Sequence, residues 1–393
     1  MKKGIGEFIK FHLAPAVVGA VAICALMFFF TAYGHVWFGP LNETTVISGQ
    51  NERVRASFGN CEGGKQSEID LGGALKTKKM LTILGSSELA LDAYSPYFFL
   101  SDSLNLPTLG YGHAYHQSFS MYCGLLAMEE FIDESKICIV VSPGWFATEG
   151  TNIEAFLEFV RPNFLKSIAH KADMADKLEV GRYVYEHIDQ VDQPGPTLKY
   201  FSNLYMARKS RFFTSFVETV KDMTPSVTYD ITERPIATTE TINVDWGKKG
   251  KVLQQEFVSK VSNSIYVRDD YFKQYLQDEE GKVKVPATTT LKSPNENREL
   301  ADFKLLVALL KKHNVKASFI IQPLNPYYYN DLENYSEIIS AVQQTIEQHN
   351  YPYFNMFVTK KEEYDPGTLR DIMHLGDYGW LKIDQFLWKE YGL

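Results

Sequence analysis

Short apolar runs alternate with amphipathic stretches in the first part of the chain. Residues 80–84 and 136–141 are apolar runs of strand length, and residues 106–111 form a strand-like piece that ends in glycine and tyrosine. Residues 117–131 have apolar positions at helical spacing. Because strands buried on both faces appear as continuous apolar runs, this order predicts strands of a covered sheet with a helix between them.

The same rhythm returns near the C-terminus. Residues 298–312 and 335–350 have the pattern of amphipathic helices, and residues 316–321 and 351–357 that of strands. Alternating strands and helices predict an α/β fold, a three-layer sandwich with a parallel central sheet. In such sheets ligands bind at the carboxyl ends of the strands.

The middle of the chain, about residues 150–300, interrupts the rhythm. Residues 152–177 and 197–223 are helical in pattern, with aromatic residues between charged ones, whereas residues 224–301 show no alternation of strands and helices. This stretch therefore predicts a helical insertion that covers or flanks the core.

The N-terminus predicts a single membrane-spanning helix. Lys2, Lys3 and Lys10 precede an apolar run over residues 13–38, and Glu43 is the first acidic residue after it. About 20 apolar residues suffice to cross the hydrocarbon, and the positive flank stays inside. We therefore expect a cytoplasmic N-terminus and anchor over residues 1–38.

A cleaved signal peptide is the alternative for this run. Signal peptides have shorter apolar cores, of about 7–15 residues, that end in small residues. The bulky Phe28, Phe29 and Phe30 near the end of this run favour an uncleaved anchor. A polar tether over residues 39–79 and an extracytoplasmic catalytic domain over residues 80–393 would follow it.

Composition narrows the possible partners. The formal net charge of −8 argues against nucleic acid and provides no general attraction to an anionic cell-wall polymer, which would need a local basic groove. Four cysteines, one of them inside the apolar run, have neither a disulfide framework nor metal-ligand spacing. No metal and no diffusible cofactor is implied.

The first chemical motif is Gly85-Ser86-Ser87-Glu88, directly after the first predicted strand. This position puts a serine at the carboxyl edge of the sheet. A serine is a poor nucleophile without an adjacent base, and alone such a turn is more often an ordinary loop or helix cap. Glu88 is expected to be an acidic residue near a helix N-terminus.

The second motif is Asp371-Ile372-Met373-His374 near the C-terminus. A carboxylate and an imidazole three residues apart can lie on one face of a helical turn, where the carboxylate fixes the imidazole tautomer. Taken alone, the pair would be a capping aspartate and a surface histidine.

Together, the two motifs resemble the SGNH (GDSL-type) hydrolase superfamily. In that superfamily the nucleophile follows the first strand, and an Asp-x-x-His block precedes the last helix, which residues 381–391 would supply. The resemblance implies that Ser87 is the nucleophile, His374 the general base and Asp371 its orienting acid.

The sequence departs from the superfamily at the oxyanion hole. Ser142 stands after its strand where an oxyanion asparagine is expected. Gly112 and Gln117 are the candidates to replace that donor, with the amide of Ser87. Asn325, which follows a later strand, is a further candidate or a turn-forming residue.

Further motifs resemble one family, the DltD family of D-alanyl-lipoteichoic acid biosynthesis proteins. They are His116-Gln117-Ser118, residues 141–146, residues 263–275 and residues 373–380. The resemblance covers the whole chain. It implies transfer of D-alanyl groups to lipoteichoic acid on the outer face of a Gram-positive cell membrane. It also implies a membrane-bound O-acyltransferase and a D-alanyl carrier protein as partners.

Two other functions remain open from the sequence. One is a thioesterase or esterase that hydrolyses mischarged D-alanyl carrier protein, although the charge asymmetry of the anchor places the domain on the other side of the membrane. The other is a non-catalytic scaffold of the D-alanylation machinery. A scaffold has no need to keep Ser87 and His374 within reach of each other.

Overall fold

The chain divides into two compact units in a computed structural model. One consists of Met1–Val46 and Leu165–Thr228, and the other of Ile47–Phe164 and Tyr229–Leu393. The residues that the structure describes are 19, 44–49, 65–89, 93–208, 226–233, 236, 243–284, 286 and 289–392. We describe each unit by itself.

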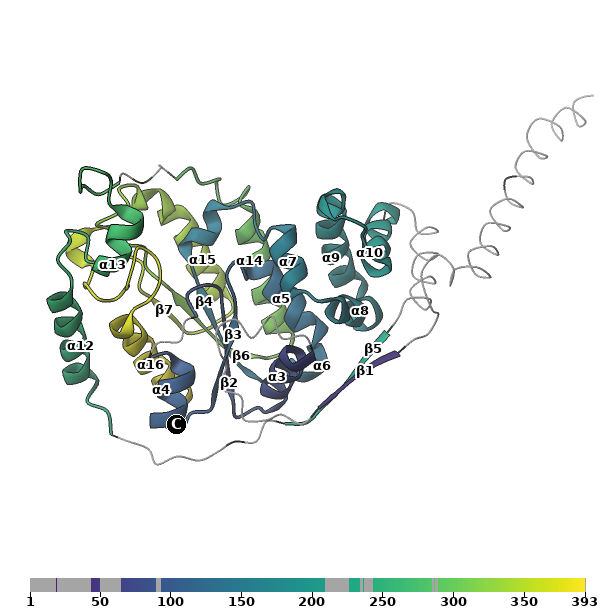
Figure 1. The fold of residues 1–393 in the computed structure, drawn as a ribbon. Helices are drawn as coiled ribbons and strands as arrows, with labels where there is room; N and C mark the ends of the chain where they lie inside the picture. The colour runs from purple at the N-terminus through teal and green to yellow at the C-terminus, as the bar shows by residue number, and fades with distance from the viewer. Residues whose placement is uncertain are drawn as a thin grey trace, which may run out of the picture. The chain divides into compact units, whose positions relative to one another are not determined.

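A five-stranded parallel sheet forms the centre of the larger unit (Figure 1). Its spatial order is β3-β2-β4-β6-β7, and neighbouring strands pair in parallel. The strands are β2 (Leu81–Gly85), β3 (Thr108–Gly112), β4 (Lys136–Val141), β6 (Lys316–Ile321) and β7 (Tyr353–Asn355). β2 and β3 are buried along their whole length, and β4 and β6 at all but their first residue.

Helices cover both faces of this sheet. On one face, Leu81 and Ile83 of β2 join a core cluster with α4 (Pro96–Ser103) and α16 (Asp377–Tyr391). On the other, Phe303 of α14 (Arg298–Lys312) contacts Phe319 of β6, with ring centroids 5.7 Å apart. Since side chains alternate between the faces of a strand, both faces carry an apolar core. The predicted α/β fold with a parallel central sheet is confirmed.

The other helices surround these layers. In the larger unit they are α3 (Lys65–Lys76), α5 (Ser118–Ala127), α6 (Glu129–Ile132), η3 (Pro143–Ala147), α7 (Ile153–Phe159), α12 (Trp246–Lys260), α13 (Asp269–Tyr271), the π-helix η5 (Phe272–Leu276), η6 (Leu332–Tyr335), α15 (Ser336–Gln348) and η7 (Lys361–Glu363). Residues 162–171 form α8 (Pro162–Lys171). β1 (Thr44–Gly49) and β5 (Ser226–Ile231) form a separate two-stranded sheet.

The smaller unit contains α9 (Met174–His187), η4 (Ile188–Gln190) and α10 (Pro196–Ala207). α9 and α10 pack closely, since a Cβ atom at Gly181 would lie 2.8 Å from the carbonyl oxygen of Phe201. The rings of Tyr185 and Tyr205 also meet, with centroids 5.4 Å apart. These helices fall within the predicted insertion.

Two segments differ from the sequence-based expectation. Residues 65–76, which we assigned to the tether, form α3, and its Leu71, Ala74 and Leu75 are at most 1% exposed. α12 lies in the stretch for which no strand–helix rhythm was seen. The larger unit thus begins earlier than residue 80 and has more helix than the pattern indicated.

The predicted membrane anchor over residues 13–38 lies, except for residue 19, outside the described residues. Among the described residues, no helix has both the length and the apolar composition needed to cross a membrane.

Candidate active site

The turn that carries Ser87 lies at the switch point of the sheet. From β2 the chain moves to β3 on one side, and later returns to β4 on the other side of β2. Doubly wound sheets bind their ligands where the strand order reverses in this way. Ser87 follows β2 directly and is partly exposed, whereas its neighbours Ser86 and Glu88 are buried. The serine is therefore the residue of this turn that a substrate can reach.

Glycine at the end of β3 allows the neighbouring loop to approach this turn. Gly112 is opposite Gly85 in the parallel pairing of β3 and β2. A Cβ atom at Gly112 would lie 2.1 Å from the Gly85 carbonyl oxygen, far inside van der Waals contact. Any other residue at position 112 would push β3 away from the turn of the serine.

Asp371 and His374 lie in an irregular loop before α16, not on the helical turn expected from their spacing. The Asp371 Oδ1 atom accepts hydrogen bonds from the amides of Met373, at 2.9 Å, and His374, at 2.7 Å. The amide of Arg370 donates to the His374 carbonyl oxygen at 2.9 Å. A side-chain turn of this kind replaces the helix and still sets the aspartate beside the histidine.

The structure brings Ser87, His374 and Asp371 together. His374 Nε2 is 3.0 Å from Ser87 Oγ, and His374 Nδ1 is 2.8 Å from Asp371 Oδ2. Since a carboxylate only accepts, Nδ1 carries the proton and donates it to Asp371. Nε2 is then free of its own proton and can accept the one on Ser87 Oγ. This is the arrangement that activates a serine for acyl transfer.

The charge of Asp371 suits this arrangement. Burial alone would raise the pKa of the carboxyl group. The hydrogen bond and positive charge of His374, with the amides of Met373 and His374, outweigh burial and lower the pKa below its ordinary value. The carboxylate therefore stays ionised at neutral pH, and its negative charge would stabilise a protonated imidazole beside it.

Both side-chain oxyanion candidates use one of the two N–H groups of their amide nitrogen in this structure. Gln117 is buried, and its Nε2 donates to Thr148 Oγ1 at 3.4 Å. Asn325 is fully buried: its Nδ2 donates to the Ile265 carbonyl oxygen at 2.9 Å, and its Oδ1 accepts from the Tyr327 amide at 2.9 Å. The structure thus favours the turn-forming role of Asn325. Gly112 can offer only its backbone.

Two residues of the site have roles that sequence reasoning missed. His116 Nδ1 lies 3.1 Å from the Gly85 carbonyl oxygen, and its ring packs on Phe159 with centroids 4.5 Å apart. Burial lowers the pKa of His116 to about 4, so the ring is neutral and donates from Nδ1. Glu88 lies in a turn, and its Oε1 accepts from the Ser86 amide at 2.6 Å. The sequence shows the motifs that contain His116 and Glu88, but it does not predict these contacts.

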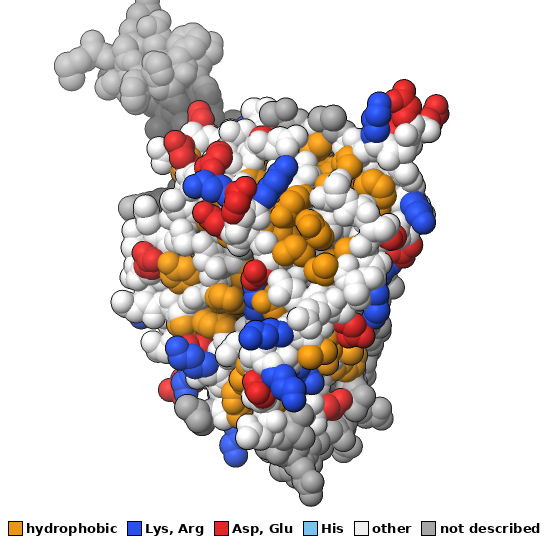
Figure 2. All heavy atoms as spheres, turned by 90° about the vertical axis from the view of Figure 1, so that its left-hand side faces the viewer, with side chains coloured by type: hydrophobic (Ala, Val, Ile, Leu, Met, Phe, Trp, Pro, Cys, Tyr) orange, Lys and Arg blue, Asp and Glu red, His pale blue; other side chains and the backbone are white. Residues whose placement is uncertain are grey.

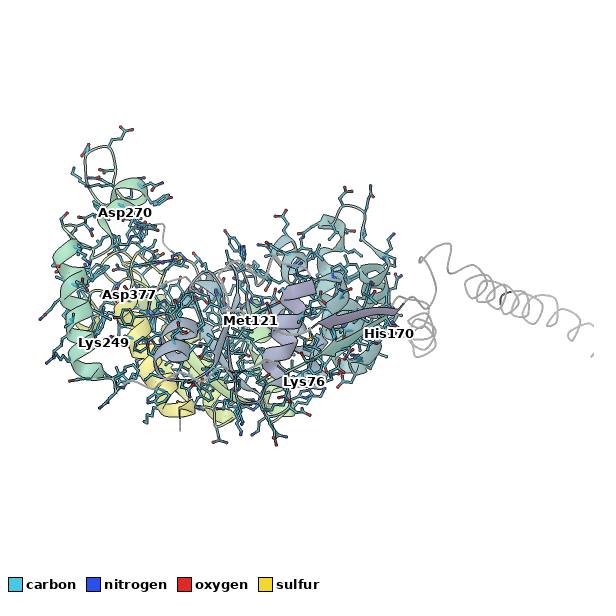
Figure 3. The ribbon with its side chains drawn as sticks, turned by 60° about the horizontal axis from the view of Figure 1, so that its bottom comes forward. Lys76, Met121, His170, Lys249, Asp270 and Asp377 are labelled. Atoms are coloured by element: carbon cyan, nitrogen blue, oxygen red, sulfur yellow. The ribbon has the colours of Figure 1, made fainter. Side chains whose placement is uncertain are left out.

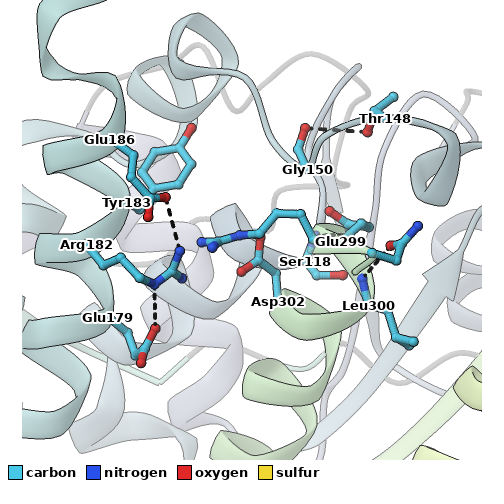
Figure 4. Close-up of polar contacts among 12 residues, drawn as sticks. Ser118, Thr148, Gly150, Glu179, Arg182, Tyr183, Glu186, Glu299, Leu300 and Asp302 are labelled. Atoms are coloured by element: carbon cyan, nitrogen blue, oxygen red, sulfur yellow. Dashed lines mark hydrogen bonds and ion pairs between the residues drawn. The ribbon is translucent and has the colours of Figure 1, made fainter. Parts of the chain in front are cut away.

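The N-terminal end of α14 holds the loops after β3 and β4 (Figure 4). Glu299 Oε1 accepts from the amide of Ser118 at 3.0 Å, and Asn297 Nδ2 donates to the Phe146 carbonyl oxygen at 2.7 Å. Burial and the neighbouring carboxylate of Asp302 raise the pKa of Glu299 to about 8. The loop that carries Gln117 is thereby fixed by a buried carboxyl group.

Part of the insertion packs on the loop that carries Asp371 and His374. Ile265, Val267 and Leu276 form a buried apolar cluster with Ile372. Partly buried tyrosines surround the cluster, at positions 271, 327, 328 and 329. The amide of Asn325 also donates to the Ile372 carbonyl oxygen at 3.0 Å. This part of the insertion therefore supports the loop of Asp371 and His374.

A cavity of about 380 Å³ lies beside the same loop, between α12 and the start of α16. Lys260, Arg268 and Arg370 line it, but so do four acidic residues, Glu256, Asp269, Asp270 and Asp377. Figure 3 shows Asp270 on the insertion and Asp377 at the start of α16. Figure 2 shows apolar patches between side chains of both charges on this side of the molecule. The cavity is not the predominantly basic groove that an anionic polymer would favour.

Within the described part of the chain, no group of three or more His, Cys, Asp or Glu side chains is arranged to hold a metal ion.

Fold and site together define an α/β protein with a serine, a histidine and an aspartate in hydrogen-bond reach at the carboxyl edge of a parallel sheet. The family model described as "DltD protein" matches residues 65–389, and the chain therefore belongs to the DltD family. The match begins at the first residue of α3. The resemblance found in the motifs is thus confirmed.

Two relatives named "Protein DltD" are similar to the chain over most of its length. That of Bacillus subtilis (strain 168) is 23% identical over 339 residues, which cover 79% of this chain and 82% of the relative. That of Lacticaseibacillus rhamnosus is 21% identical over 417 residues, which cover 98% of this chain and 92% of the relative.

Proposed function

We propose that the chain transfers D-alanyl groups onto lipoteichoic acid through an acyl-enzyme on Ser87. Its family is implicated in the D-alanylation of teichoic acids. The observation that carries the proposal is the chain of contacts from Ser87 Oγ to His374 Nε2, 3.0 Å, and from His374 Nδ1 to Asp371 Oδ2, 2.8 Å. These contacts supply an activated nucleophile, a base and an orienting carboxylate.

The reaction has two steps. Ser87 Oγ attacks the carbonyl carbon of a D-alanyl donor while its proton passes to His374 Nε2, and the departing group of the donor then takes that proton. In the second step a hydroxyl of the polymer gives its proton to His374 and attacks the acyl carbon. Ser87 Oγ leaves and recovers the proton, so the enzyme returns to its starting state.

Each step needs hydrogen-bond donors for the oxyanion. The Ser87 amide makes no hydrogen bond to the described part of the chain, and we assign it as the first donor. Gly112 and Gln117 remain the candidates for the second, from the loop that His116 and Glu299 hold in place. Losing one such donor costs acyl-transfer enzymes about 2.7–4 kcal/mol of transition-state stabilisation.

An acyltransferase must also keep water from its acyl-enzyme. The side chain of His374 is 25% exposed and that of Asp371 9% exposed. The site is therefore partly covered before any substrate binds, and the polymer itself would complete the cover.

The proposed location is the outer face of the cytoplasmic membrane. The family is associated with the cell envelope, and the basic flank of the apolar run over residues 13–38 supports a single-pass anchor with the catalytic unit outside. A membrane-bound O-acyltransferase and the D-alanyl carrier protein would supply the acyl group, within the D-alanylation machinery.

Ester-linked D-alanine on lipoteichoic acid, measured in deletion cells complemented with variants, tests the function. We expect Ser87→Ala and His374→Ala each to abolish the esters, and the double variant to be no worse, because such residues act as a unit. Ser86→Ala is the matched control: it keeps the backbone bonds of the turn and should leave ester levels close to wild type.

Other outcomes separate the rival functions. Wild-type ester levels with Ser87→Ala would refute the acyl-enzyme and favour the scaffold. In the same cells, protease added to intact protoplasts should digest the catalytic unit. Complete protection would refute the outer location and favour the carrier thioesterase.

A further inference from the structure

The backbone of the turn around Ser87 is held by two side chains. Glu88 Oε1 accepts from the Ser86 amide at 2.6 Å, and His116 Nδ1 donates to the Gly85 carbonyl oxygen at 3.1 Å. Glu88 is 2% exposed and His116 3% exposed. Both contacts are therefore shielded from competing water, which makes them strong restraints on the turn.

The contact of Glu88 spans the nucleophile. Its donor, Ser86, and its acceptor, Glu88, are the residues on either side of Ser87, so the hydrogen bond closes a short ring that contains the backbone of the serine. The carboxyl group of Glu88 also lies close to the backbone of Gly85. A Cβ atom at Gly85 would lie 3.0 Å from Glu88 Oε1 and 2.8 Å from the Leu89 side chain.

The charge of Glu88 is coupled to that of His374. Burial raises the pKa of Glu88 to about 7, while the Ser86 amide and the positive charge of His374 lower it. Asp371, 2.8 Å from His374, is the other anion on the imidazole, and the Arg370 Nε atom lies 3.9 Å from Asp371. His116 is neutral above mildly acidic pH because burial lowers its pKa to about 4.

We propose that Glu88 is a positioning residue that holds the Ser87 turn through the Ser86 amide and stabilises the imidazolium of His374 by its negative charge. The inference rests on the proposed function in that Ser87 is taken as the nucleophile. When the proton of Ser87 Oγ passes to His374 Nε2, a positive charge appears on a ring that Asp371 holds at 2.8 Å and with which the Glu88 carboxylate interacts by charge.

A fluorophosphonate probe tests this directly on the full-length protein in detergent. Ser87 Oγ attacks the phosphorus atom, fluoride leaves and His374 takes the proton, so the labelling rate measures the activation of Ser87 without any polymer. The rate is followed between about pH 5 and 9, the range in which histidine and a glutamate with a raised pKa titrate.

Glu88→Gln separates the charge from the hydrogen bond, since its amide oxygen can still accept from Ser86. We expect labelling roughly tenfold slower than wild type, which corresponds to about 1.4 kcal/mol less stabilisation of the transition state. The midpoint of the pH profile should move to lower pH, because an imidazolium without this anion loses its proton more easily. Glu88→Ala, which also loses the hydrogen bond, should label more slowly still.

Asp384→Asn is the matched control. Asp384 is a fully buried carboxyl on α16 whose pKa burial likewise raises, and its replacement should leave the midpoint unchanged. An unchanged midpoint and rate in Glu88→Gln would overturn the inference. It would also be overturned if Asp384→Asn slowed labelling as much as Glu88→Gln did and the midpoint of the pH profile did not shift. If Glu88→Ala fails to fold, Glu88→Gln decides. Absence of labelling at Ser87 in the folded wild type would instead refute the proposed function.

Discussion

At the residue scale, the geometry of the candidate site depends on backbone hydrogen bonds as much as on the side chains of Ser87, His374 and Asp371. Ser87 and His374 are 287 residues apart in the chain, yet their side chains meet at 3.0 Å. Asp371 contributes through both oxygens: Oδ2 holds the imidazole, while Oδ1 holds the amides of Met373 and His374. One carboxylate therefore both shapes the loop and orients the base.

Asp371→Asn and Asp371→Ala separate these two tasks. Asn keeps an acceptor for both amides but places an NH₂ group against Nδ1, which favours the wrong imidazole tautomer; a loss of activity on the order of 10⁴-fold is typical of such a change. Both variants should still retain more activity than Ser87→Ala. Probe labelling gives the rate, and thermal unfolding the stability.

The second task of Asp371, which is to hold the two backbone amides of its loop, should affect the thermal stability of the protein. Asp371→Ala leaves two backbone amides without their acceptor, at about 1 kcal/mol each, so it should unfold at a lower temperature than Asp371→Asn. Equal melting temperatures, or a labelling rate of Asp371→Asn close to wild type, would contradict the two roles given to this carboxylate.

The candidate triad was predictable because each member lies in a short motif next to a predicted strand or helix. The residues that hold the candidate triad in place were not predictable. The role of His116 depends on the approach of Gly112 to Gly85 across two parallel strands, a distance that no local pattern encodes. The role of Asn325 depends on a carbonyl oxygen 60 residues earlier in the chain.

At the element scale, the loop of Asp371 is coupled to the insertion through Asn325. This fully buried residue connects three segments: its side chain bonds Ile265 and Tyr327, and its amide bonds Ile372. The apolar cluster of Ile265, Val267 and Leu276 rests on the same Ile372. Motion of the insertion and motion of the loop of Asp371 and His374 should therefore be linked.

Asn325→Leu tests this link, because leucine has a similar size but no polar atoms. The Ile265 carbonyl and the Tyr327 amide would lose their partners, at about 1–3 kcal/mol for each buried group. We expect faster amide hydrogen exchange over residues 263–276 and slower probe labelling of Ser87. Asn325→Asp, which keeps the acceptor for Tyr327 but not the donor for Ile265, should fall between. Labelling at the wild-type rate despite faster exchange would show that the two elements move independently.

Elements with one buried face were predictable, and elements without one were not. α14 and β6 begin and end as the pattern predicted, since buried positions recur along both. α12 has a single fully buried residue, Gly250, and its Trp246 and Leu253 are only partly buried against the core, so few of its positions are core positions. The sequence places α3 in the tether because residues 39–79 are polar, contain glycine and end in a basic run. Yet Gly72 is needed for close packing: a Cβ atom there would lie 2.7 Å from the Ile231 side chain.

At the scale of the whole molecule, several buried carboxyl groups ionise at a higher pH than exposed ones do. Burial raises the pKa of Glu88 to about 7, that of Glu299 to about 8, and that of Asp384 well above its ordinary value. A group whose pKa is higher in the folded than in the unfolded state stabilises the fold at low pH. That contribution is lost as the pH rises through the folded pKa. Asp371, with its lowered pKa, acts in the opposite sense at acid pH.

Glu299→Gln isolates one of these contributions. Glutamine can still accept from the Ser118 amide, but it does not titrate. The unfolded glutamate ionises near pH 4.5 and the folded one near pH 8. The free energy of unfolding of the wild type should therefore fall, relative to that of Glu299→Gln, between these values. A buried group with such a shift changes stability by on the order of a few kcal/mol. Urea unfolding at several pH values measures the difference, in which the contributions of Asp371 and His116 cancel. A constant difference across this window would mean that Glu299 ionises in the folded protein as it does in the unfolded chain.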